Sequence, residues 1–417
     1  MNYSESLAYL NSFTNFEASL WRLNRHSWNL QRMEILLDWF NHPEKRFFPI
    51  LIAGTKGKGS TGFFLESMLE SSGISSGFYS SPHLQSPRER IRLGGRMISE
   101  NKWSEYLSRI KALIEKRKLS KRFGKFTYFE IMTLMAILVF AEAKVKVGIF
   151  EIGMGGRLDA TNVLQAPLCI FTRIDYDHEK FLGETLSQIA EEKAAIIKKN
   201  NVVVVSPQNP EAMKVIRTKA RRTRSTIKLT SPVQGVKIGL LGNAQKTNAG
   251  SAKAAVQALK ENFGFKFSME AALEGLEKAN WPGRFEIIRK NGICFILDGA
   301  HNPASIQELV KTLAQHYPKA QRILVFGTSS DKKSARMLGS LSGYFSDIIL
   351  TQARHLRSKP ASELLMEAQK HFRKIVPTGN VCQAFEIAQS LAKKETVVVM
   401  TGSFYVIGEA RTCLKSV

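Results

Sequence analysis

The chain has 417 residues, of which 44% are hydrophobic and 23% are charged, and its formal net charge is +24 at pH 7. This length and composition predict a soluble globular protein with two domains. The most apolar stretch, residues 131–141, is too short to cross a bilayer and is flanked by Glu130 and Glu142. We therefore expect no membrane partner and a cytoplasmic location.

The strong positive charge suggests polyanionic partners, and basic residues are densest at residues 116–125 and 217–228. Neither run is interleaved with the aromatic residues of a base-stacking surface, and the sequence contains no helix-turn-helix, finger or RNP motif. We interpret the charge mainly as solvated surface and attraction of anionic small molecules, so nucleic acid is not the expected partner. A basic nucleotide-binding protein that acts on nucleic acid is kept as the non-enzymatic alternative.

The four cysteines are far apart in the sequence and include no CxxC pair. This spacing does not indicate a zinc site, and we expect all four to be reduced core residues. They are Cys169, Cys294, Cys382 and Cys413.

In chain order, helical spacing is present first at residues 4–21 and 30–40. The sequence ILIAGTKGKGS at residues 50–60 then places a buried strand directly before a glycine-rich loop and another helix. This order of strand, loop and helix predicts a phosphate-binding site.

The loop has the residues that an anion requires. Gly54, Gly57 and Gly59 allow backbone N–H groups to approach a phosphate, and Lys58 adds a full positive charge at the helix N-terminus. Ser60 offers a hydroxyl to a magnesium ion or to the helix as a cap. Taken alone, the loop is also compatible with a glycine-rich turn that carries a solvated lysine.

The rest of the first part alternates between strands and helices. Strands are predicted at residues 75–80, 145–150, 168–174 and 202–205, and helices at residues 103–118, 126–143 and 184–199. This alternation predicts an α/β fold with a doubly wound, mostly parallel sheet. The phosphate loop, Glu151 and His178 all follow strand ends, so we expect them to converge on one metal and one nucleotide.

Residues 206–242 lack apolar periodicity, and we predict surface structure with little regular order there. Helices at residues 249–263 and 269–279 follow. Strands at residues 293–297, 323–326, 347–350 and 397–400 then predict a second, smaller α/β domain. We place the boundary between residues 283 and 284, which gives domains of residues 1–283 and 284–417. Asp298 and His301 follow the first of these strands, so we expect the second domain to contribute to a site in an interdomain cleft.

The ordered motifs resemble those of folylpolyglutamate synthase and dihydrofolate synthase, members of the Mur ligase superfamily, over almost the whole chain. GTKGKGS is similar to the family's GTNGKGS loop. SPHL with ERI, TYFE, EIGMGGRLDATN, the segment DHEKFLGETLSQIAEEKAAIIK, WPGRFE and LDGAHNP follow in the family's order. The resemblance implies a Mur-ligase-like fold, with the P-loop in a larger N-terminal ATPase domain and a smaller Rossmann-like C-terminal glutamate-ligase domain.

The resemblance also implies an ATP-dependent amide ligase of folate biosynthesis and one-carbon metabolism. ATP would phosphorylate a carboxylate of dihydropteroate or of a reduced folate, and the amino group of L-glutamate would attack the acyl phosphate. Mg²⁺ is the implied cofactor, and the family implies a monomer. The alternative enzyme is another ligase of the superfamily, such as a cell-wall ligase that joins amino acids to a nucleotide-linked sugar; SPHL, TYFE and the extra Gly59 argue against it.

The resemblance assigns site residues position by position. For ATP it implies Gly57, Lys58, Gly59, Ser60, Asn248, Arg284 and Asp298. For the metal it implies Ser81, Glu151 and His178. For the pterin it implies Thr127, Tyr128, Phe129, Leu158, Asp159 and Ala160. For catalysis it implies Lys58, Lys193 and His301, with Lys193 carrying a carbamate formed with carbon dioxide.

Three positions depart from the family's pattern. Lys56 replaces the usual asparagine of the loop, and we expect it to place an extra cation beside the phosphates. Ala244 stands where the family has a histidine, which removes one expected contact on the adenine side. Ala195 replaces a glycine after the EEKA motif.

Overall fold

The computed structural model describes residues 1–17, 29–117, 119–120, 123–345 and 347–416. The helix expected at residues 4–21 ends at Asn11, and residues 12–17 are not helical, so that prediction is wrong for its second half. Residues 18–21 of that prediction and part of the basic run at residues 116–125 lie outside the described residues. The chain divides into two compact units. Unit 1 contains Met1–Pro82, Arg88–Ile238 and Lys246–Ala279, and unit 2 contains His83–Pro87, Gly239–Gln245 and Asn280–Val417.

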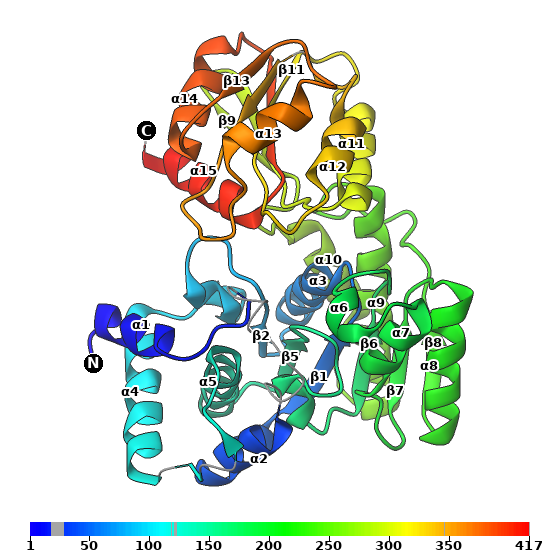
Figure 1. Ribbon diagram of the computed structural model, residues 1–417. Coiled ribbons are helices and arrows are strands. Elements are labelled where there is room, and N and C mark those ends of the chain that lie inside the picture. Colours follow the sequence, from blue (N-terminus) through cyan, green and yellow to red (C-terminus); the bar gives the residue numbers. More distant parts are fainter. Residues whose placement is uncertain (18–28, 118, 121–122, 346, 417) are drawn as a thin grey trace. The chain divides into compact units, whose positions relative to one another are not determined.

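Unit 1 is built on an eight-stranded sheet (Figure 1). Its strands are β1 (Phe48–Ala53), β2 (Ser76–Tyr79), β3 (Ile91–Leu93), β4 (Arg96–Met97), β5 (Val147–Glu151), β6 (Leu168–Phe171), β7 (Val202–Val205) and β8 (Thr226–Leu229). The spatial order is β4-β3-β2-β5-β1-β6-β7-β8, and only the pairs β2–β3 and β3–β4 are antiparallel. The predicted doubly wound, mostly parallel sheet is confirmed.

The topology of this sheet defines where a ligand is expected. From β1 the chain leads to β2 on one side, whereas from β5, which lies next to β1, it leads to β6 on the other side. The carboxyl ends of β1 and β5 therefore form a topological switch point, where open α/β sheets bind ligands. In the register of these strands Ile52 pairs with Glu151, so Glu151 lies level with the end of β1.

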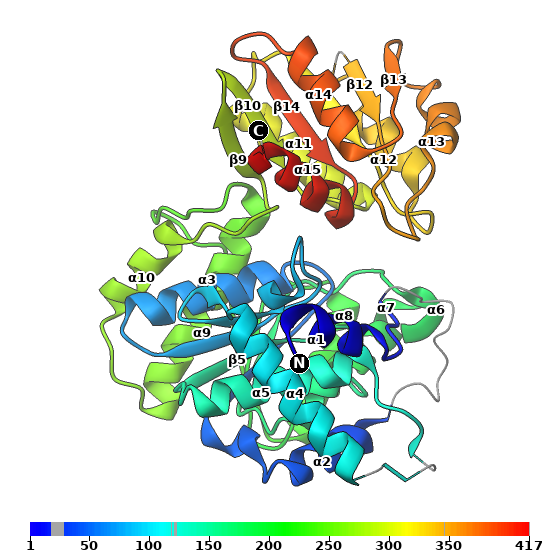
Figure 2. The same ribbon diagram turned by 90° about the vertical axis from the view of Figure 1, so that its left-hand side faces the viewer.

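Helices cover both faces of the unit 1 sheet (Figure 2). They are α1 (Tyr3–Asn11), α2 (Leu30–Trp39), α3 (Lys58–Ser71), α4 (Glu100–Arg117), α5 (Tyr128–Glu142), α6 (Glu179–Leu182), α7 (Leu186–Ala194), α8 (Pro210–Arg222), α9 (Asn243–Phe263) and α10 (Met269–Lys278), with short 3₁₀ turns η3 (Pro43–Arg46), η4 (Pro87–Arg90) and η6 (Ala160–Val163). Helix α3 packs on β1, β2 and β5, and α10 packs on α3. On the other face, Leu51, Phe150 and Phe171 join one core cluster with residues of α5 and α7.

The buried helix predicted at residues 126–143 is confirmed as α5, whose Ile131, Leu134 and Ile137 are fully buried. The prediction of little regular order at residues 206–242 is wrong, because α8 and β8 lie there. Helix α8 has a narrow buried face, which includes Ala212 and Ile216, among many basic residues. Strand β8 is an edge strand without a buried residue. Neither element therefore carries a strong apolar pattern.

Unit 2 is a six-stranded sheet in the order β13-β12-β11-β14-β10-β9. Its strands are β9 (Glu286–Lys290), β10 (Ile293–Leu297), β11 (Arg322–Phe326), β12 (Asp347–Leu350), β13 (Ile375–Pro377) and β14 (Val397–Thr401). Strand β9 is antiparallel to β10 and the other pairs are parallel. The four strands predicted here are confirmed, whereas the two edge strands, β9 and β13, were not predicted.

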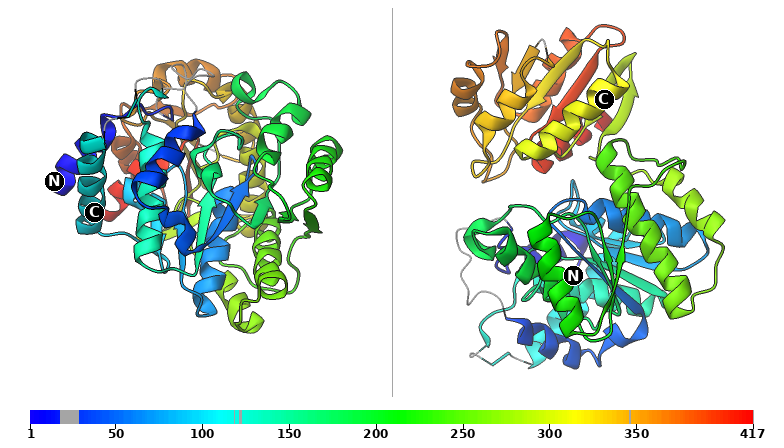
Figure 3. Two further views of the ribbon diagram at one scale, coloured as in Figure 1. Left: turned by 90° about the horizontal axis from the view of Figure 1, so that it is seen from below. Right: turned by 90° about the vertical axis from the view of Figure 1, so that its right-hand side faces the viewer.

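The helices of unit 2 lie on both faces of its sheet (Figure 3). They are α11 (Pro303–His316), α12 (Ser334–Leu341), α13 (Ala361–Ala368), α14 (Val381–Leu391) and α15 (Phe404–Ser416). Residues of α11, α12 and α13 form one core cluster with the sheet, and residues of α14 and α15 form the other. Among the helices of the described residues, none combines the length and hydrophobicity needed to cross a membrane.

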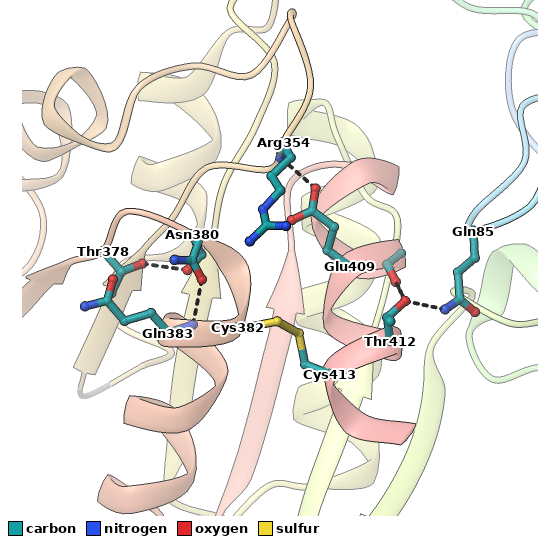
Figure 4. Close-up of a disulfide and its surroundings, with 10 residues drawn as sticks. Gln85, Arg354, Thr378, Asn380, Cys382, Gln383, Glu409, Thr412 and Cys413 are labelled. Atoms are coloured by element: carbon teal, nitrogen blue, oxygen red, sulfur yellow. Dashed lines mark hydrogen bonds between the residues drawn. A yellow bond between two sulfur atoms is a disulfide. The ribbon is translucent and has the colours of Figure 1, made fainter. Parts of the chain in front are cut away.

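A disulfide between Cys382 and Cys413 joins α14 to α15 (Figure 4). The expectation that all four cysteines are reduced is therefore wrong for this pair. Cys169 and Cys294 are free and buried, as expected. The two bonded cysteines are 31 positions apart in the sequence and meet only because their helices pack on the same face of the sheet.

Candidate active site

The phosphate loop connects β1 to α3 at the switch point of unit 1. Gly57 caps α3 with a φ of 87°, a left-handed conformation that a residue with a side chain rarely adopts. A Cβ on Gly57 would lie 2.2 Å from Oδ1 of Asn248, so the Asn248 side chain lies directly against the loop. The Lys58 Nζ donates a hydrogen bond to the Gly54 carbonyl oxygen at 3.2 Å, so its ammonium folds back over the loop. Thus Gly57, Lys58 and Asn248 lie together.

Asp175, in the loop after β6, contacts the phosphate loop through hydrogen bonds with Thr55 and an ion pair with Lys56. The Thr55 hydroxyl donates to the Asp175 carbonyl oxygen at 2.9 Å and accepts from the Asp175 N–H at 3.0 Å. Lys56 pairs with the Asp175 carboxylate at 2.9 Å. Burial alone would raise the pKa of Asp175, but the hydrogen bond and charge of Lys56 bring it below its usual value. Lys56 is therefore a paired cation rather than the uncompensated extra charge that its departure from the family pattern suggested.

Glu151 ends β5 beside the first turn of α3. Its side chain is buried, and its Oε2 accepts a hydrogen bond from the Ser81 N–H at 3.2 Å. A Cβ on Gly59 would lie 3.3 Å from the same oxygen, so the glycine permits the helix to approach the carboxylate. The structure thus brings Ser81 and Glu151, two of the three predicted metal ligands, to the start of α3.

His178, the third predicted metal ligand, is the residue that precedes α6 and has a φ of 51°. Its Nε2 lies 3.8 Å from the Asp177 carboxylate. Within the described ranges, no three His, Cys, Asp or Glu side chains form a group that could hold a metal ion. The predicted set is a carboxylate, a hydroxyl and an imidazole, and its oxygen donors fit a hard cation such as magnesium that takes further ligands from phosphate and water.

Lys193 lies on α7 and is 4% exposed. A Cβ on Gly156 would lie 3.0 Å from the Lys193 Cα, so this part of α7 packs directly against the glycine loop after β5. Burial, together with the nearby charge of Lys58, lowers the pKa of Lys193 to about 7, although the charges of Asp177 and Asp159 act in the opposite direction. A substantial share of Lys193 is therefore a neutral amine near pH 7, which is the form that reacts with carbon dioxide.

The two segments predicted to bind the pterin also meet. Thr127 caps α5 in a reciprocal pair of hydrogen bonds with Glu130. A Cβ on Gly153 would lie 2.7 Å from the ring of Phe129, so the glycine loop after β5 lies directly against that ring. The ring of Tyr79 also lies near that of Phe129, at 5.8 Å between centroids. In the second segment, Leu158 is 38% exposed and Ala160 is buried.

Asp159 organises the loop in which it lies. Its Oδ2 accepts hydrogen bonds from the N–H groups of Gly153 and Met154, at 3.0 and 3.1 Å. Its Oδ1 accepts from the N–H and the hydroxyl of Thr161, at 3.0 and 2.6 Å. Burial raises the pKa of Asp159, and these hydrogen bonds oppose that rise. Four acceptor positions are thus engaged by the protein, and the pterin-binding role of Asp159 stays a prediction.

In unit 2, three predicted residues lie at the carboxyl ends of β10 and β14. Asp298 accepts hydrogen bonds from the N–H groups of Phe285 and Ala300, at 2.8 and 2.9 Å. Burial raises the pKa of Asp298, and the charge of Arg284 opposes that rise. The Arg284 guanidinium lies 4.6 Å from the ring centre of Phe404, and the His301 ring lies 5.8 Å from the same ring.

Two residues that lie at the candidate site, Asp175 and Phe404, were not predicted from the sequence. Asp175 follows β6, and its contacts with the phosphate loop depend on β1 and β6 being neighbours. Phe404 was not identified at all. Its position shortly after a buried strand, in the sequence TGSFY, is the signal that could have placed it at the carboxyl end of β14.

Residues 52–269 match the family described as "Mur ligase middle domain", and residues 283–404 match "Mur ligase, glutamate ligase domain". The dihydrofolate synthase/folylpolyglutamate synthase of Bacillus subtilis (strain 168) is 32% identical, over 93% of this chain and 95% of that protein.

Solved structures of the same enzyme family have the same fold as this chain. E. coli FolC in complex with DHPP and ADP superposes with a TM-score of 0.85 at 27% identity, covering 100% of this chain and 98% of that one. The bifunctional folylpolyglutamate synthase/dihydrofolate synthase of Yersinia pestis, complexed with AMPPNP and Mn ion, superposes with a TM-score of 0.84 at 28% identity over the same shares. The predicted Mur-ligase-like fold is confirmed, and the chain belongs to the dihydrofolate synthase/folylpolyglutamate synthase family of the Mur ligases.

Proposed function

We propose that this protein is an ATP-dependent ligase that adds L-glutamate to dihydropteroate and to reduced folates. The observation that carries the proposal is that Lys58 and Glu151, with the glycine loop that packs against Lys193, lie at the switch point of a sheet in a fold shared with solved structures of this ligase family. The comparisons give no support to a cell-wall ligase or to a nucleic-acid-binding protein.

We propose that residues 1–283 form the ATP-binding domain and residues 284–417 the glutamate-ligase domain. In the first, Gly57, Gly59 and Ser60 present the helix N-terminus to the phosphates, and Asn248 lies against the loop. Lys58 neutralises negative charge that develops as the γ-phosphoryl group is transferred. Arg284 and Asp298 are the ATP-binding residues of the second domain.

A divalent metal accompanies the nucleotide in this proposal, as Mn ion does in the Yersinia pestis complex. We propose Mg²⁺, held by Ser81, Glu151 and His178, where it would neutralise phosphate charge. The Glu151 carboxylate already contacts the Ser81 N–H and the first turn of α3. It could therefore bind a metal ion at the phosphate loop with little movement.

Lys193 is the proposed site of a carbamate. Its lowered pKa makes the neutral amine available for reaction with carbon dioxide. Modification would also change the sign of its electrostatic interaction with Lys58. As ammonium, Lys193 would repel Lys58; as a carbamate it would carry a negative charge and attract it. The modification therefore stabilises the lysine of the phosphate loop.

The proposed chemistry has two steps. A carboxylate oxygen of dihydropteroate or folate attacks the γ-phosphorus of ATP, and ADP leaves with the electrons of the broken P–O bond. The glutamate amino group then attacks the acyl carbon, phosphate leaves and the nitrogen loses a proton. His301 is proposed to face the reacting groups, and Lys58 stabilises the phosphate in the first step.

The pterin is proposed to bind between the first turn of α5 and the loop after β5. This assignment uses Thr127, Tyr128, Phe129, Leu158, Asp159 and Ala160. Phe129 and the partly exposed Leu158 offer apolar contact to a flat ring. For Asp159 to contact the pterin, one of the hydrogen bonds that it accepts from its own loop must be exchanged for a pterin donor.

We further propose a cytoplasmic monomer.

The test is an ATP-dependent glutamate ligation assay, run in parallel with dihydropteroate, a reduced folate monoglutamate and a muramyl nucleotide. We expect ADP, phosphate and a glutamylated product with the first two substrates, and no turnover with the third. Turnover with the muramyl nucleotide alone would contradict the proposal. Salt-resistant binding to RNA or DNA without any ligation would contradict it as well.

A further inference from the structure

Arg90 is the last residue of η4, and it is 2% exposed. Its Nη1 and Nη2 donate hydrogen bonds to the two carboxylate oxygens of Glu17, at 2.9 and 2.6 Å. This two-bond geometry fixes the plane of the guanidinium as well as its position. The Arg90 side chain is buried and the Glu17 side chain is 32% exposed, and a partly exposed ion pair contributes little net stability. The more specific effect of the pair is to fix the orientation of Arg90.

Arg90 touches two segments of the proposed active site. Its carbonyl oxygen accepts a hydrogen bond from the N–H of Ser80, next to the proposed metal ligand Ser81. Its guanidinium carbon lies 5.4 Å from the ring centre of Tyr128, in the first turn of α5. The backbone and the side chain of one residue thus connect the end of β2 with the proposed pterin segment.

The N-terminal segment that carries Glu17 also contacts the first turn of α5. The N–H of Tyr128 donates to the carbonyl oxygen of Thr14 at 3.0 Å, and Thr14 forms a parallel β-bridge with Thr127. The start of α5 is therefore contacted by Thr14 and by Arg90, which is itself bonded to Glu17. Tyr128 is held both by the hydrogen bond of its N–H and by the Arg90 guanidinium over its ring.

We propose that Arg90, oriented by Glu17, is a positioning residue that sets the first turn of α5 for pterin binding. Because Phe129 follows Tyr128 and packs against Gly153, a shift of Tyr128 is transmitted to the face that receives the pterin. The inference rests on the proposed function, since it assigns these residues to the pterin side of that site. It adds Arg90 and Glu17, neither of which touches the reacting atoms.

The chain offers a matched control two residues further on. Arg92 pairs with the buried Glu66 at 2.9 Å, and its guanidinium carbon lies 5.0 Å from the ring centre of Phe63. The two arginines thus make the same kinds of contact, but Arg92 contacts Phe63 of α3 rather than the first turn of α5. The Arg92 side chain is 18% exposed and bonds Glu66 through Nε alone, so Arg92→Lys measures the cost of replacing an arginine that pairs with a glutamate and lies over an aromatic ring outside the proposed pterin site.

The experiment measures dihydropteroate binding by titration calorimetry in the absence of ATP, and then KM and kcat in the ligation assay. It compares the full chain with Arg90→Lys, Glu17→Gln and Arg92→Lys. Lysine cannot reproduce the two-bond fork. We expect Arg90→Lys to weaken dihydropteroate binding and to raise its KM by about tenfold, which corresponds to about 1.4 kcal/mol. The KM for ATP and kcat should change by less than about twofold, because the residue stabilises substrate binding rather than phosphoryl transfer.

Glu17→Gln keeps the shape of the side chain and should change the same KM in the same direction. Arg92→Lys should lower the unfolding temperature, as Arg90→Lys does, but leave dihydropteroate binding unchanged. Equal weakening in Arg90→Lys and Arg92→Lys, or unchanged binding in a folded Arg90→Lys, would overturn the inference. If the unmodified protein binds neither dihydropteroate nor a reduced folate, the proposed function fails, and this inference fails with it.

Discussion

Lys58 begins α3 and folds its ammonium back over the phosphate loop. Because it is proposed to stabilise charge during transfer, Lys58→Ala should lower kcat by about 100- to 1,000-fold. The unfolding temperature should stay the same, since a partly exposed loop lysine contributes little to stability. Steady-state kinetics with a thermal melt measure both quantities. Lys56→Asn, which restores the usual loop residue, is the control and should retain turnover; an equal loss in both variants would contradict the role of Lys58.

The pKa of Lys193, which burial and Lys58 lower to about 7, predicts a pH dependence for its modification. The amine is mostly charged at about pH 6 and mostly neutral at about pH 8, and only the neutral form adds carbon dioxide. Enzyme depleted of carbon dioxide should therefore recover activity with bicarbonate at pH 8 but not at pH 6.

The matching measurement is ¹³C NMR of active protein incubated with labelled bicarbonate. We expect one carbamate signal, which is lost in Lys193→Ala together with activity. Lys198→Met is the control, because Lys198 also has a lowered pKa, about 8, but donates to the carbonyl oxygens of Asn162 and Leu164. Absence of a carbamate signal from fully active protein would refute the modification.

At the residue scale, sequence predicted which side chains meet but not how each is used. Glu151 and Lys58 could be placed together, because parallel strands bring their carboxyl ends to one edge. The four hydrogen bonds of Asp159 and the ion pair of Lys56 could not be predicted, since each depends on the path of a loop.

The disulfide between Cys382 and Cys413 gives a prediction at the scale of elements. In the chain-entropy account, closing a loop with a sequence separation of 31 residues stabilises the fold by about 3 to 4 kcal/mol. Reduction, or Cys382→Ser, should lower the unfolding transition of unit 2. Labelling of the unfolded, unreduced protein should detect two thiols, and a reductant should have no further effect on Cys382→Ser. Detection of four thiols would show that the bond does not form.

At the scale of elements, the sequence pattern predicts buried strands better than edge strands. Strands buried on both faces, such as β1 and β7, are continuous apolar runs and were predicted within two residues. Strands β8, β9 and β13 lie at sheet edges and are partly exposed, so their patterns are weak. The position of β5 between β1 and β2 was also not predictable, because sequence order does not determine spatial order.

At the scale of the whole molecule, the sequence predicted the mostly parallel α/β architecture because strands and helices alternate along most of the chain. The net charge of +24 is consistent with substrates that are anions, since ATP, glutamate and folates are all negatively charged at pH 7. The central claim is that a substrate carboxylate is activated by phosphorylation before glutamate attacks it.

Transfer of ¹⁸O from the substrate carboxylate tests that claim most directly. Dihydropteroate labelled in both carboxylate oxygens is turned over with ATP and L-glutamate, and the phosphate and amide products are analysed by mass spectrometry. If an acyl phosphate forms, one labelled oxygen leaves with phosphate in each turnover and the other stays in the amide. Phosphate without label, or AMP and pyrophosphate in place of ADP and phosphate, would contradict the account.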